Sequence, residues 1–115
     1  MNKPRRGEVW IVALDPTVGR EIRKTRPAVV ISNDINNEYS DTVTVIPITS
    51  SSRKVYPFEV VLSTGEGGLG CDSKAKADQI RTIDTQRLVR CIGSLSTAKI
   101  REFEHALAIH LDIQK

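Results

Sequence analysis

Short apolar runs with alternating polar neighbours dominate the first two thirds of the chain. They are rich in β-branched residues and bounded by turn residues, a pattern typical of β-strands. The pattern predicts four clear strands and two weaker ones, at 8–14, 27–32, 42–48 and 58–62, then around 71–77 and 88–92. Pro47 suggests an edge strand or a bulge, because proline has no N–H to give to a ladder. A short helix or single helical turn is expected after the second strand, at 33–37.

The spacing of apolar residues changes to a helical period after residue 95. Four large apolar residues recur at i, i+3, i+7 and i+11 and form one face: Ile100, Phe103, Leu107 and Leu111. Ser96 suits the N-cap, and Leu95 with Ile100 suits a hydrophobic staple. The sequence therefore predicts a C-terminal amphipathic helix.

These elements predict a single domain over residues 1–115, mainly β with α. So many short strands in so few residues favour a small barrel or a strongly coiled antiparallel sheet, because closure protects strand edges. The glycine-rich segment 63–70 is expected to be a flexible hairpin loop. It lacks the Lys-Ser/Thr of a phosphate-binding loop.

Charge is unevenly distributed along the chain. Residues 1–30 hold seven basic and three acidic side chains, a net of +4, in a chain whose total is +3. Such a basic stretch favours a polyanion such as nucleic acid, because phosphate neutralisation supplies affinity that does not depend on sequence. A solvated basic N-terminus kept for solubility is the alternative interpretation.

Several classes of protein are not indicated. No apolar run approaches the roughly 20 residues of a membrane helix, and no secretory signal is evident. Cys71 and Cys91, with no CxxC pair, suggest reduced thiols and a cytoplasmic location. His105 and His110 are five residues apart on the predicted helix and cannot share a metal. No carboxylate cluster for two-metal chemistry is evident, so no cofactor is expected, and a nuclease of this sequence would work without metal.

Six segments occur in an order and at spacings that are informative together. They are RGEVW (6–10), LDPTVGRE (14–21), TRPAVVISND (25–34), IPITS (46–50), YPFEVVL (56–62) and ADQIRTID (77–84). On these segments the chain resembles the MazF/PemK/Kid family of toxin endoribonucleases, the mRNA interferases of bacterial toxin–antitoxin modules. The resemblance implies an SH3-like barrel that forms a homodimer. It also implies sequence-specific cleavage of single-stranded RNA without metal, leaving a 2′,3′-cyclic phosphate and a 5′-hydroxyl.

The resemblance also implies site residues and partners. Arg26, which opens the second strand, and Thr49, which ends the third, match the family's catalytic pair. We expect RNA-binding residues in the loops around 15–25 and 50–57 and in the Asp-Gln segment: Arg20, Glu21, Ser50, Ser51, Phe58, Asp78 and Gln79. An acidic antitoxin protein should neutralise the toxin, and contact with DNA should occur only indirectly, through the antitoxin complex.

The chain departs from one branch of the family at two positions. That branch has a histidine in the first loop and an arginine two before the aspartate, where this chain has Arg20 and Lys76. Only Arg26 and Thr49 therefore receive catalytic roles. An arginine is a poor general base because its pKa lies above ~12, so we expect Arg26 to stabilise charge and Thr49 to hydrogen-bond a phosphate oxygen.

Alternative interpretations exist for the residues and for the whole chain. Arg26 could instead form a surface ion pair with Glu21 or Asp78, and Thr49 could be an ordinary turn residue. A toxin of the same fold that poisons DNA gyrase needs a C-terminal tryptophan, whereas the only tryptophan here is Trp10. A non-catalytic SH3-like module that binds nucleic acid or protein is a further alternative. The cleavage sequence and the antitoxin's identity do not follow from the residues.

Overall fold

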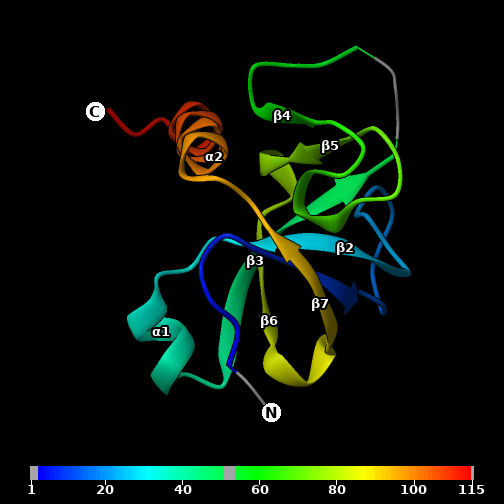
Figure 1. Cartoon of the computed structure of the whole chain (residues 1–115), viewed down its shortest axis with the longest axis vertical. Coiled ribbons are helices and arrows are strands. Elements are labelled where there is room, and N and C mark those ends of the chain that lie inside the picture. The colour runs from blue at the N-terminus through cyan, green and yellow to red at the C-terminus, as the bar shows by residue number, and fades with distance from the viewer. Residues whose placement is uncertain (1–2, 51–53, 115) are drawn as a thin grey trace.

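One strongly bent antiparallel sheet organises the chain (Figure 1). The computed structural model describes residues 3–50 and 54–114. Within these ranges lie seven strands and two α-helices: β1 (Glu8–Ala13), β2 (Thr25–Val30), α1 (Asp34–Tyr39), β3 (Thr42–Thr49), β4 (Glu59–Leu62), β5 (Ser73–Lys76), β6 (Arg81–Asp84), β7 (Leu88–Ser94) and α2 (Thr97–Leu111). Three 3-10 turns join them: η1 (Glu66–Gly68), η2 (Ala77–Gln79) and η3 (Thr85–Arg87).

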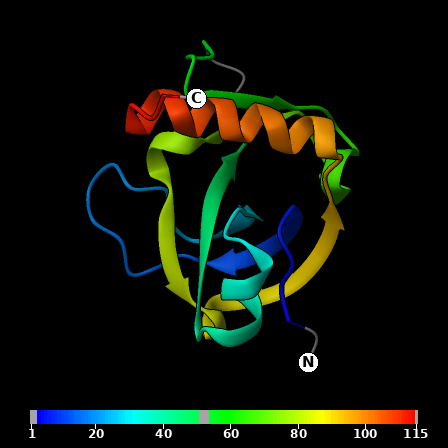
Figure 2. The same cartoon turned by 90° about the vertical axis from the view of Figure 1, so that its left-hand side faces the viewer.

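The strand order confirms a coiled antiparallel sheet of mainly β class. Neighbouring strands run β4-β5-β3-β2-β1-β7, and β6 also pairs with β3. Within the described residues β4 and β7 are not paired to each other, so the sheet curls without closing. Of the two forms expected, a small barrel or a coiled sheet, the structure therefore has the coiled sheet. Figure 2 shows the curved strands with α2 lying across one end of them.

Two hydrophobic cores occupy opposite faces of the sheet. The first core lies between the sheet and α2 and includes Val29, Ile46 and Phe103. The second core lies inside the curl of the sheet and includes Trp10, Val12, Leu14, Ala28, Val30, Val43 and Val45. Because strand side chains alternate between faces, odd and even positions of β1, β2 and β3 serve different cores.

Both helices begin as the sequence indicates. Ser96 caps α2 by accepting a hydrogen bond from the Lys99 amide at 3.1 Å, and Phe103 is fully buried on the apolar face. Asn33 caps α1 by accepting from the Asn36 amide at 2.8 Å, so the expected helical turn is a short helix. None of the described helices is long and apolar enough to cross a membrane.

Pro47 lies neither on an edge strand nor at a bulge of the β2–β3 pairing, whose register runs without a shift, so the expectation of an edge or a bulge is wrong. It pairs with Ala28 of β2 in the middle of the sheet. On its other side, β3 changes partner from β6, which ends its pairing at Val45, to β5, which begins at Ile48. The missing N–H of proline falls in this gap between partners, where no ladder bond is required.

The glycine-rich segment is a packed turn, and the expectation of a flexible loop there is wrong. Gly67 is buried in η1, and Leu69 is part of the first core. A Cβ added to Gly68 would lie 1.9 Å from the carbonyl oxygen of Ile92. Glycine is therefore required because η1 lies directly against the backbone of β7.

Candidate functional site

Arg26 and Thr49 lie at the same end of two neighbouring strands. The β2–β3 register pairs Ala28 with Pro47 and Val30 with Val45. The same register, carried two residues further, sets Arg26 across from Thr49. Both residues have the parity of positions that face the second core, so their side chains emerge on one face of the sheet at its exposed end.

The Arg26 side chain is half-buried and is held by the backbone rather than by a carboxylate. Its Nε donates to the carbonyl oxygen of Arg23 at 3.0 Å. Among the described residues it forms no salt bridge, so the ion pair with Glu21 or Asp78 is not present. Pro27 keeps Arg26 extended within β2, which further limits where the guanidinium can lie. The fork of the guanidinium thus remains available to an anion.

Thr49 ends β3 and lies opposite Lys74 of β5. The Thr49 side chain is half-buried, and no described residue hydrogen-bonds its hydroxyl. Ser50 follows it and is exposed, while Ser51 lies outside the described residues. A threonine hydroxyl that has no partner among residues 3–50 and 54–114 can donate a hydrogen bond to an oxyanion at this end of the sheet.

The loop between β1 and β2 is fixed by Gln79 at its side. The Gln79 amide oxygen accepts from the Ile22 amide at 3.2 Å, and its Nε2 donates to the Arg20 carbonyl at 3.2 Å. Glu21 stabilises the same loop by accepting from the Val18 amide at 2.7 Å. The structure therefore brings Arg20, Glu21 and Gln79 together, with Gln79 acting on the loop backbone. Asp78, beside Gln79 in η2, is exposed.

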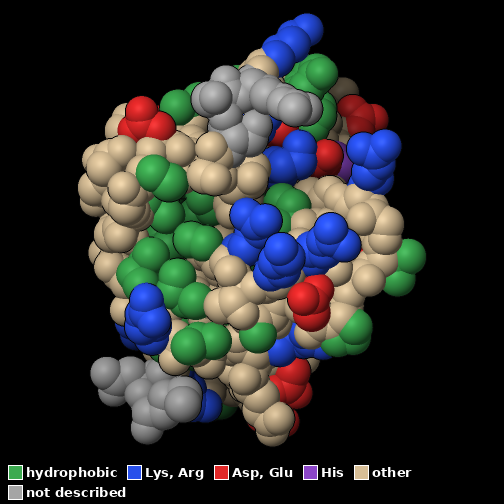
Figure 3. Space-filling view, turned by 90° about the vertical axis from the view of Figure 1, so that its right-hand side faces the viewer, with side chains coloured by type: hydrophobic (Ala, Val, Ile, Leu, Met, Phe, Trp, Pro, Cys, Tyr) green, Lys and Arg blue, Asp and Glu red, His purple; other side chains and the backbone are tan. Residues whose placement is uncertain are grey.

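Basic side chains gather on the face that carries this loop. Arg20, Arg23 and Lys24 are exposed, and Arg26 lies at the start of the adjoining strand. Figure 3 shows Lys and Arg side chains clustered near the middle of this face. Four of the seven basic side chains of the first 30 residues thus share one surface, which is the arrangement that attracts a phosphate backbone. The other three contact the helices instead: Lys3 donates to the Glu38 carbonyl, Arg5 pairs with Asp34, and Arg6 pairs with Glu104.

Aromatic rings form a small stack beside the β3–β4 connection. The rings of Tyr56 and Phe58 are stacked, with centroids 5.5 Å apart and planes at 9°. Lys54 places its Nζ 5.3 Å from the Tyr56 centroid, and His110 of α2 tilts against Phe58 at 6.5 Å. The backbone carbonyl of Phe58 accepts from the Ala77 amide at 3.1 Å, which holds the stack next to the Asp78 segment. Tyr56 is exposed and Phe58 is half-buried, and accessible flat rings of this kind can stack on nucleobases.

A buried ion network next to Thr49 was missed by the sequence reasoning. Glu59 is fully buried and accepts from Lys74 Nζ at 3.0 Å and from Lys76 Nζ at 2.7 Å. Burial raises the pKa of Glu59, but hydrogen bonds from Lys76, the Tyr56 amide and Lys74 outweigh it, so the pKa lies below its ordinary value. The hydrogen bond to Glu59 raises the pKa of Lys76 despite its partial burial. The sequence signal that could have indicated this network is the spacing of Lys74 and Lys76, which are two residues apart and so lie on one face of a short strand.

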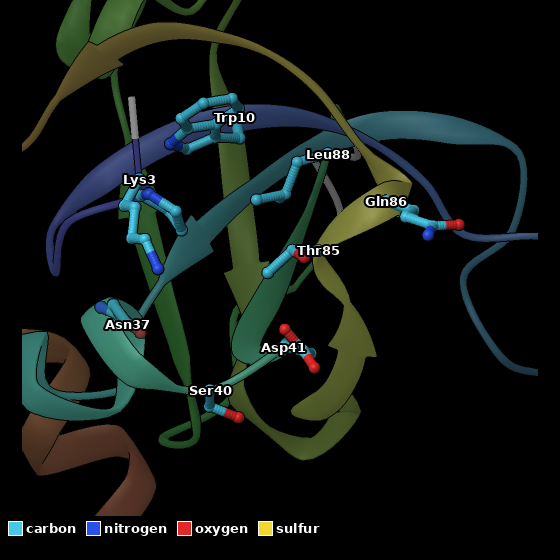
Figure 4. Close-up of a pocket in the computed structure, with 9 residues that line it drawn as sticks. Lys3, Trp10, Asn37, Ser40, Asp41, Thr85, Gln86 and Leu88 are labelled. Carbon is cyan, nitrogen blue, oxygen red and sulfur yellow. The ribbon is translucent and has the colours of Figure 1, made fainter. Parts of the chain in front are cut away.

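The pocket in Figure 4 lies at the other end of the molecule. It has a volume of about 450 Å³ and is lined by Trp10 and Leu88 at one side and Asp41 at the other. Asp41 immediately precedes β3, whereas Thr49 ends it, and β3 spans about 23 Å at roughly 3.3 Å per residue. The pocket is therefore distinct from the Arg26–Thr49 end of the sheet. Within the described residues no group of three or more His, Cys, Asp or Glu side chains could hold a metal ion.

Fold and site together define a class: a small basic β protein with an arginine and a threonine at one end and on one face of its sheet. Comparison with known proteins identifies the family. Residues 5–111 match the family described as PemK-like, MazF-like toxin of type II toxin–antitoxin system, and the chain belongs to it.

Individual relatives agree with this assignment. The chain is 49% identical to endoribonuclease MazF9 of Mycobacterium tuberculosis over 114 residues, covering 95% of this chain and 97% of that one. The crystal structure of MazF from Deinococcus radiodurans superposes with a TM-score of 0.85 at 27% identity, covering 97% and 99% of the two chains. The MazE–MazF structure from the same organism gives 0.75 at 26% identity, covering 99% and 100%.

Proposed function

We propose that this chain is an endoribonuclease toxin that cleaves single-stranded RNA, mRNA above all, at a short sequence and stops translation until an antitoxin neutralises it. Family membership and the similarity to endoribonuclease MazF9 support the activity. The observation that carries the site assignment is the common end and face of Arg26 and Thr49. The RNA it acts on would be cytoplasmic.

The chemistry that suits this pair is attack by the 2′-hydroxyl on the adjacent phosphorus. The 2′-oxygen loses its proton as its bond to phosphorus forms, and the 5′-oxygen takes up a proton as its bond to phosphorus breaks. The products are a 2′,3′-cyclic phosphate and a 5′-hydroxyl, with no net change in the number of protons. The phosphorane formed on the way carries extra negative charge. Arg26 would stabilise that charge with its planar fork, and Thr49 would hydrogen-bond a non-bridging oxygen. We assign the charge-stabilising role to Arg26 and therefore require no metal in the reaction.

Recognition of the RNA sequence would come from the two loops and the aromatic stack. Arg20 and Glu21 lie on the β1–β2 loop, with Asp78 and Gln79 beside it. Ser50 and Ser51 follow Thr49, and Phe58 offers a ring to a base. Because the loop is fastened by Gln79, we propose that Gln79 acts on specificity mainly by holding Arg20 and Glu21 in place.

The proposal is tested by digesting a long RNA in EDTA, mapping the cut, and then using an oligonucleotide that contains the site. Mass analysis should find a 2′,3′-cyclic phosphate and a 5′-hydroxyl, with a rate indifferent to EDTA. The matched control substrate carries a single 2′-deoxy sugar at the cleaved position and should stay intact. A 3′-hydroxyl with a 5′-phosphate would contradict the mechanism. An RNA that is bound but never cut would favour the non-catalytic binding module.

We also propose that the chain acts as a homodimer. Exposed apolar side chains support this: Val61 on the edge strand β4 lines one hollow with His105. Ile109 of α2 and Ile113, just beyond the end of α2, line a second hollow that shares His105. Light scattering at micromolar concentration should report a dimer. Ile109→Asp should give a monomer, whereas Ile35→Asp, at an exposed position on α1, should not. A wild-type monomer would contradict this proposal.

An acidic antitoxin is the expected protein partner. A free ribonuclease would degrade the messages of its own cell, and the basic face shown in Figure 3 suits an acidic peptide that folds on contact. Co-purification should yield a small acidic protein that abolishes cleavage at equimolar ratio. If the pure chain cuts RNA but is harmless when expressed alone, the antitoxin is not needed and this part fails.

The gyrase-poisoning alternative has no support in the described structure. The only tryptophan of the chain, Trp10, belongs to the second core, with 7% of its surface exposed. Its indole Nε1 donates to Glu8 at 3.1 Å. A buried and hydrogen-bonded side chain cannot serve as the exposed anchor of a partner protein.

A further inference from the structure

Lys74 is a buried cation with two acceptors. Only 7% of its side chain is exposed. Its Nζ donates to Glu59 at 3.0 Å and to the backbone carbonyl of Lys54 at 2.9 Å. Lys74 is therefore bonded both to a carboxylate of the sheet and to the connection between β3 and β4.

The same network holds that connection at a second point. The Tyr56 amide donates to Glu59 Oε1 at 2.9 Å, and the Glu59 amide donates to the Tyr56 carbonyl at 2.9 Å. Residues 54–58, which we name the aromatic segment, are thus fastened at Lys54 by Lys74 and at Tyr56 by Glu59. The segment carries the stacked rings of Tyr56 and Phe58.

Lys74 also lies beside the proposed catalytic threonine. It is the register partner of Thr49, and directly opposed side chains of an antiparallel pair share a face. The Lys74 side chain therefore connects the strand position of Thr49 with the aromatic segment. Two of the three donors of its Nζ are used by Glu59 and Lys54, and the side chain is only 7% exposed, so Lys74 is poorly placed to bind a phosphate itself.

A contribution to folding stability does not by itself explain why a lysine occupies this buried position. Burying an ion pair costs desolvation, and replacement by well-packed apolar side chains is often neutral or stabilising. What an apolar side chain cannot supply is the hydrogen bond to the Lys54 carbonyl, which fixes one conformation of the segment.

We propose that Lys74 is a positioning residue for substrate recognition: it holds the aromatic segment at a set place relative to Thr49, so that a base flanking the cleaved phosphate finds its stacking surface already formed. The inference rests on the proposed ribonuclease function. A positioning role predicts that loss of the Lys74 ammonium changes KM and leaves kcat nearly unchanged, because the reacting groups at Arg26 and Thr49 are untouched.

The decisive variant is Lys74→Met, which keeps the unbranched side chain up to the position of Cε and removes the ammonium with both of its hydrogen bonds. Glu59 keeps Lys76 and the Tyr56 amide as partners. With the oligonucleotide substrate, KM should rise roughly five- to twentyfold, the scale of one lost hydrogen bond, with kcat within about twofold. Lys74→Arg keeps the charge and the donors and should bring KM most of the way back.

Lys99→Met is the matched control. Lys99 is also largely covered, with 16% of its side chain exposed, and its Nζ likewise donates to a backbone carbonyl, that of Val61 at 3.1 Å, and pairs with Glu66. It lies on α2 and does not touch the aromatic segment. Its loss should leave KM unchanged, so a KM effect confined to Lys74→Met separates positioning from general loosening.

Amide hydrogen exchange gives a readout that needs no RNA. Exchange within residues 54–58 should be faster in Lys74→Met than in the wild type and unchanged in Lys99→Met. A wild type that cuts no RNA would overturn the proposed function, and this exchange result would then decide the anchoring on its own. Unchanged exchange together with wild-type KM would overturn the inference. A fall in kcat at constant KM would do so as well, since it would place Lys74 in the chemistry.

Glu59→Gln keeps the test decisive if Lys74→Met does not fold. It preserves the shape of the side chain and one acceptor while weakening both attachments of the aromatic segment. It should also raise KM and speed exchange at 54–58. A folded Glu59→Gln protein with wild-type KM and wild-type exchange would count against the network as a positioning device.

Discussion

Arg26 lies near the start of β2 and Thr49 lies at the end of β3. Because these two strands are antiparallel, both residues lie at the same end of the strand pair. The β2–β3 register brings them to the same end of the pair, and their parity brings them to the same face. Rigid neighbouring strands fix this relation more firmly than two loops could. A phosphate at this end would meet a guanidinium and a hydroxyl at once, so the two residues should behave as a unit.

Removing the Arg26 guanidinium should lower the cleavage rate without altering the fold. Arg26→Ala is expected to reduce the single-turnover rate by a factor on the order of 10²–10³, the scale for one lost oxyanion donor. Arg26→Lys should restore little, because an ammonium lacks the planar fork. Arg23→Ala, a neighbouring exposed arginine, is the matched control and should mainly affect binding. A folded Arg26→Ala protein that cuts at the wild-type rate would overturn the site.

The Thr49 hydroxyl can be tested separately from its methyl group. Thr49→Ala should lower the single-turnover rate by a factor similar to that of Arg26→Ala or smaller. Thr49→Ser keeps the hydroxyl and should retain most of the activity. Circular dichroism and the melting temperature should stay close to wild type, because Thr49 lies at the half-buried end of β3. Equal losses in the alanine and serine variants would contradict a role for the hydroxyl.

The part of the site that lies on regular strands could be predicted from the sequence. The apolar runs at 27–32 and 42–48 put Arg26 and Thr49 at strand ends, and the structure has both there. The β6 strand was not predicted, because a run of four mostly polar residues is too short to show an alternation of apolar and polar positions. It forms through pairing with β3, from Thr42 opposite Asp84 to Val45 opposite Arg81.

Burial and close approach of distant segments could not be predicted from local composition. Lys74 in a strand would ordinarily face solvent, and only its pairing with β3 and β4 places it over Glu59. The glycine-rich segment looks like a loop because nothing local indicates that β7, more than twenty residues downstream, lies against it. Such contacts depend on tertiary structure, which periodicity does not encode.

The contact of Gly68 with β7 predicts a large difference between two glycine substitutions. Gly68 has φ +79°, and a Cβ there would lie 1.9 Å from the Ile92 carbonyl oxygen. Gly68→Ala should therefore lower the free energy of unfolding by about 3 kcal/mol, through backbone strain and overpacking. Gly65 has φ +94° with nothing within 4 Å, so Gly65→Ala should cost only about 1 kcal/mol. Urea unfolding compares the two, and equal effects would contradict the packed turn.

The buried carboxylate of Glu59 predicts a dependence of stability on pH. Its pKa is lowered from the ordinary 4.5, so its stabilising contribution is fully present above pH 4.5 and is lost as the pH falls through the lowered pKa. Glu59→Gln leaves Lys74 and Lys76 without their anion and should cost about 3 kcal/mol of unfolding free energy at pH 7.

The gap in unfolding free energy between the wild type and Glu59→Gln should therefore narrow as the pH falls well below 4.5. Asp34 and Asp72 also have lowered pKa values, but both proteins retain them, so they cancel in the difference. Urea unfolding of both proteins at pH 7 and at a series of acidic pH values measures the gap directly. A gap that stays constant over this range would show that Glu59 is not held as a carboxylate by the two lysines, and the network around Lys74 would lose its electrostatic basis.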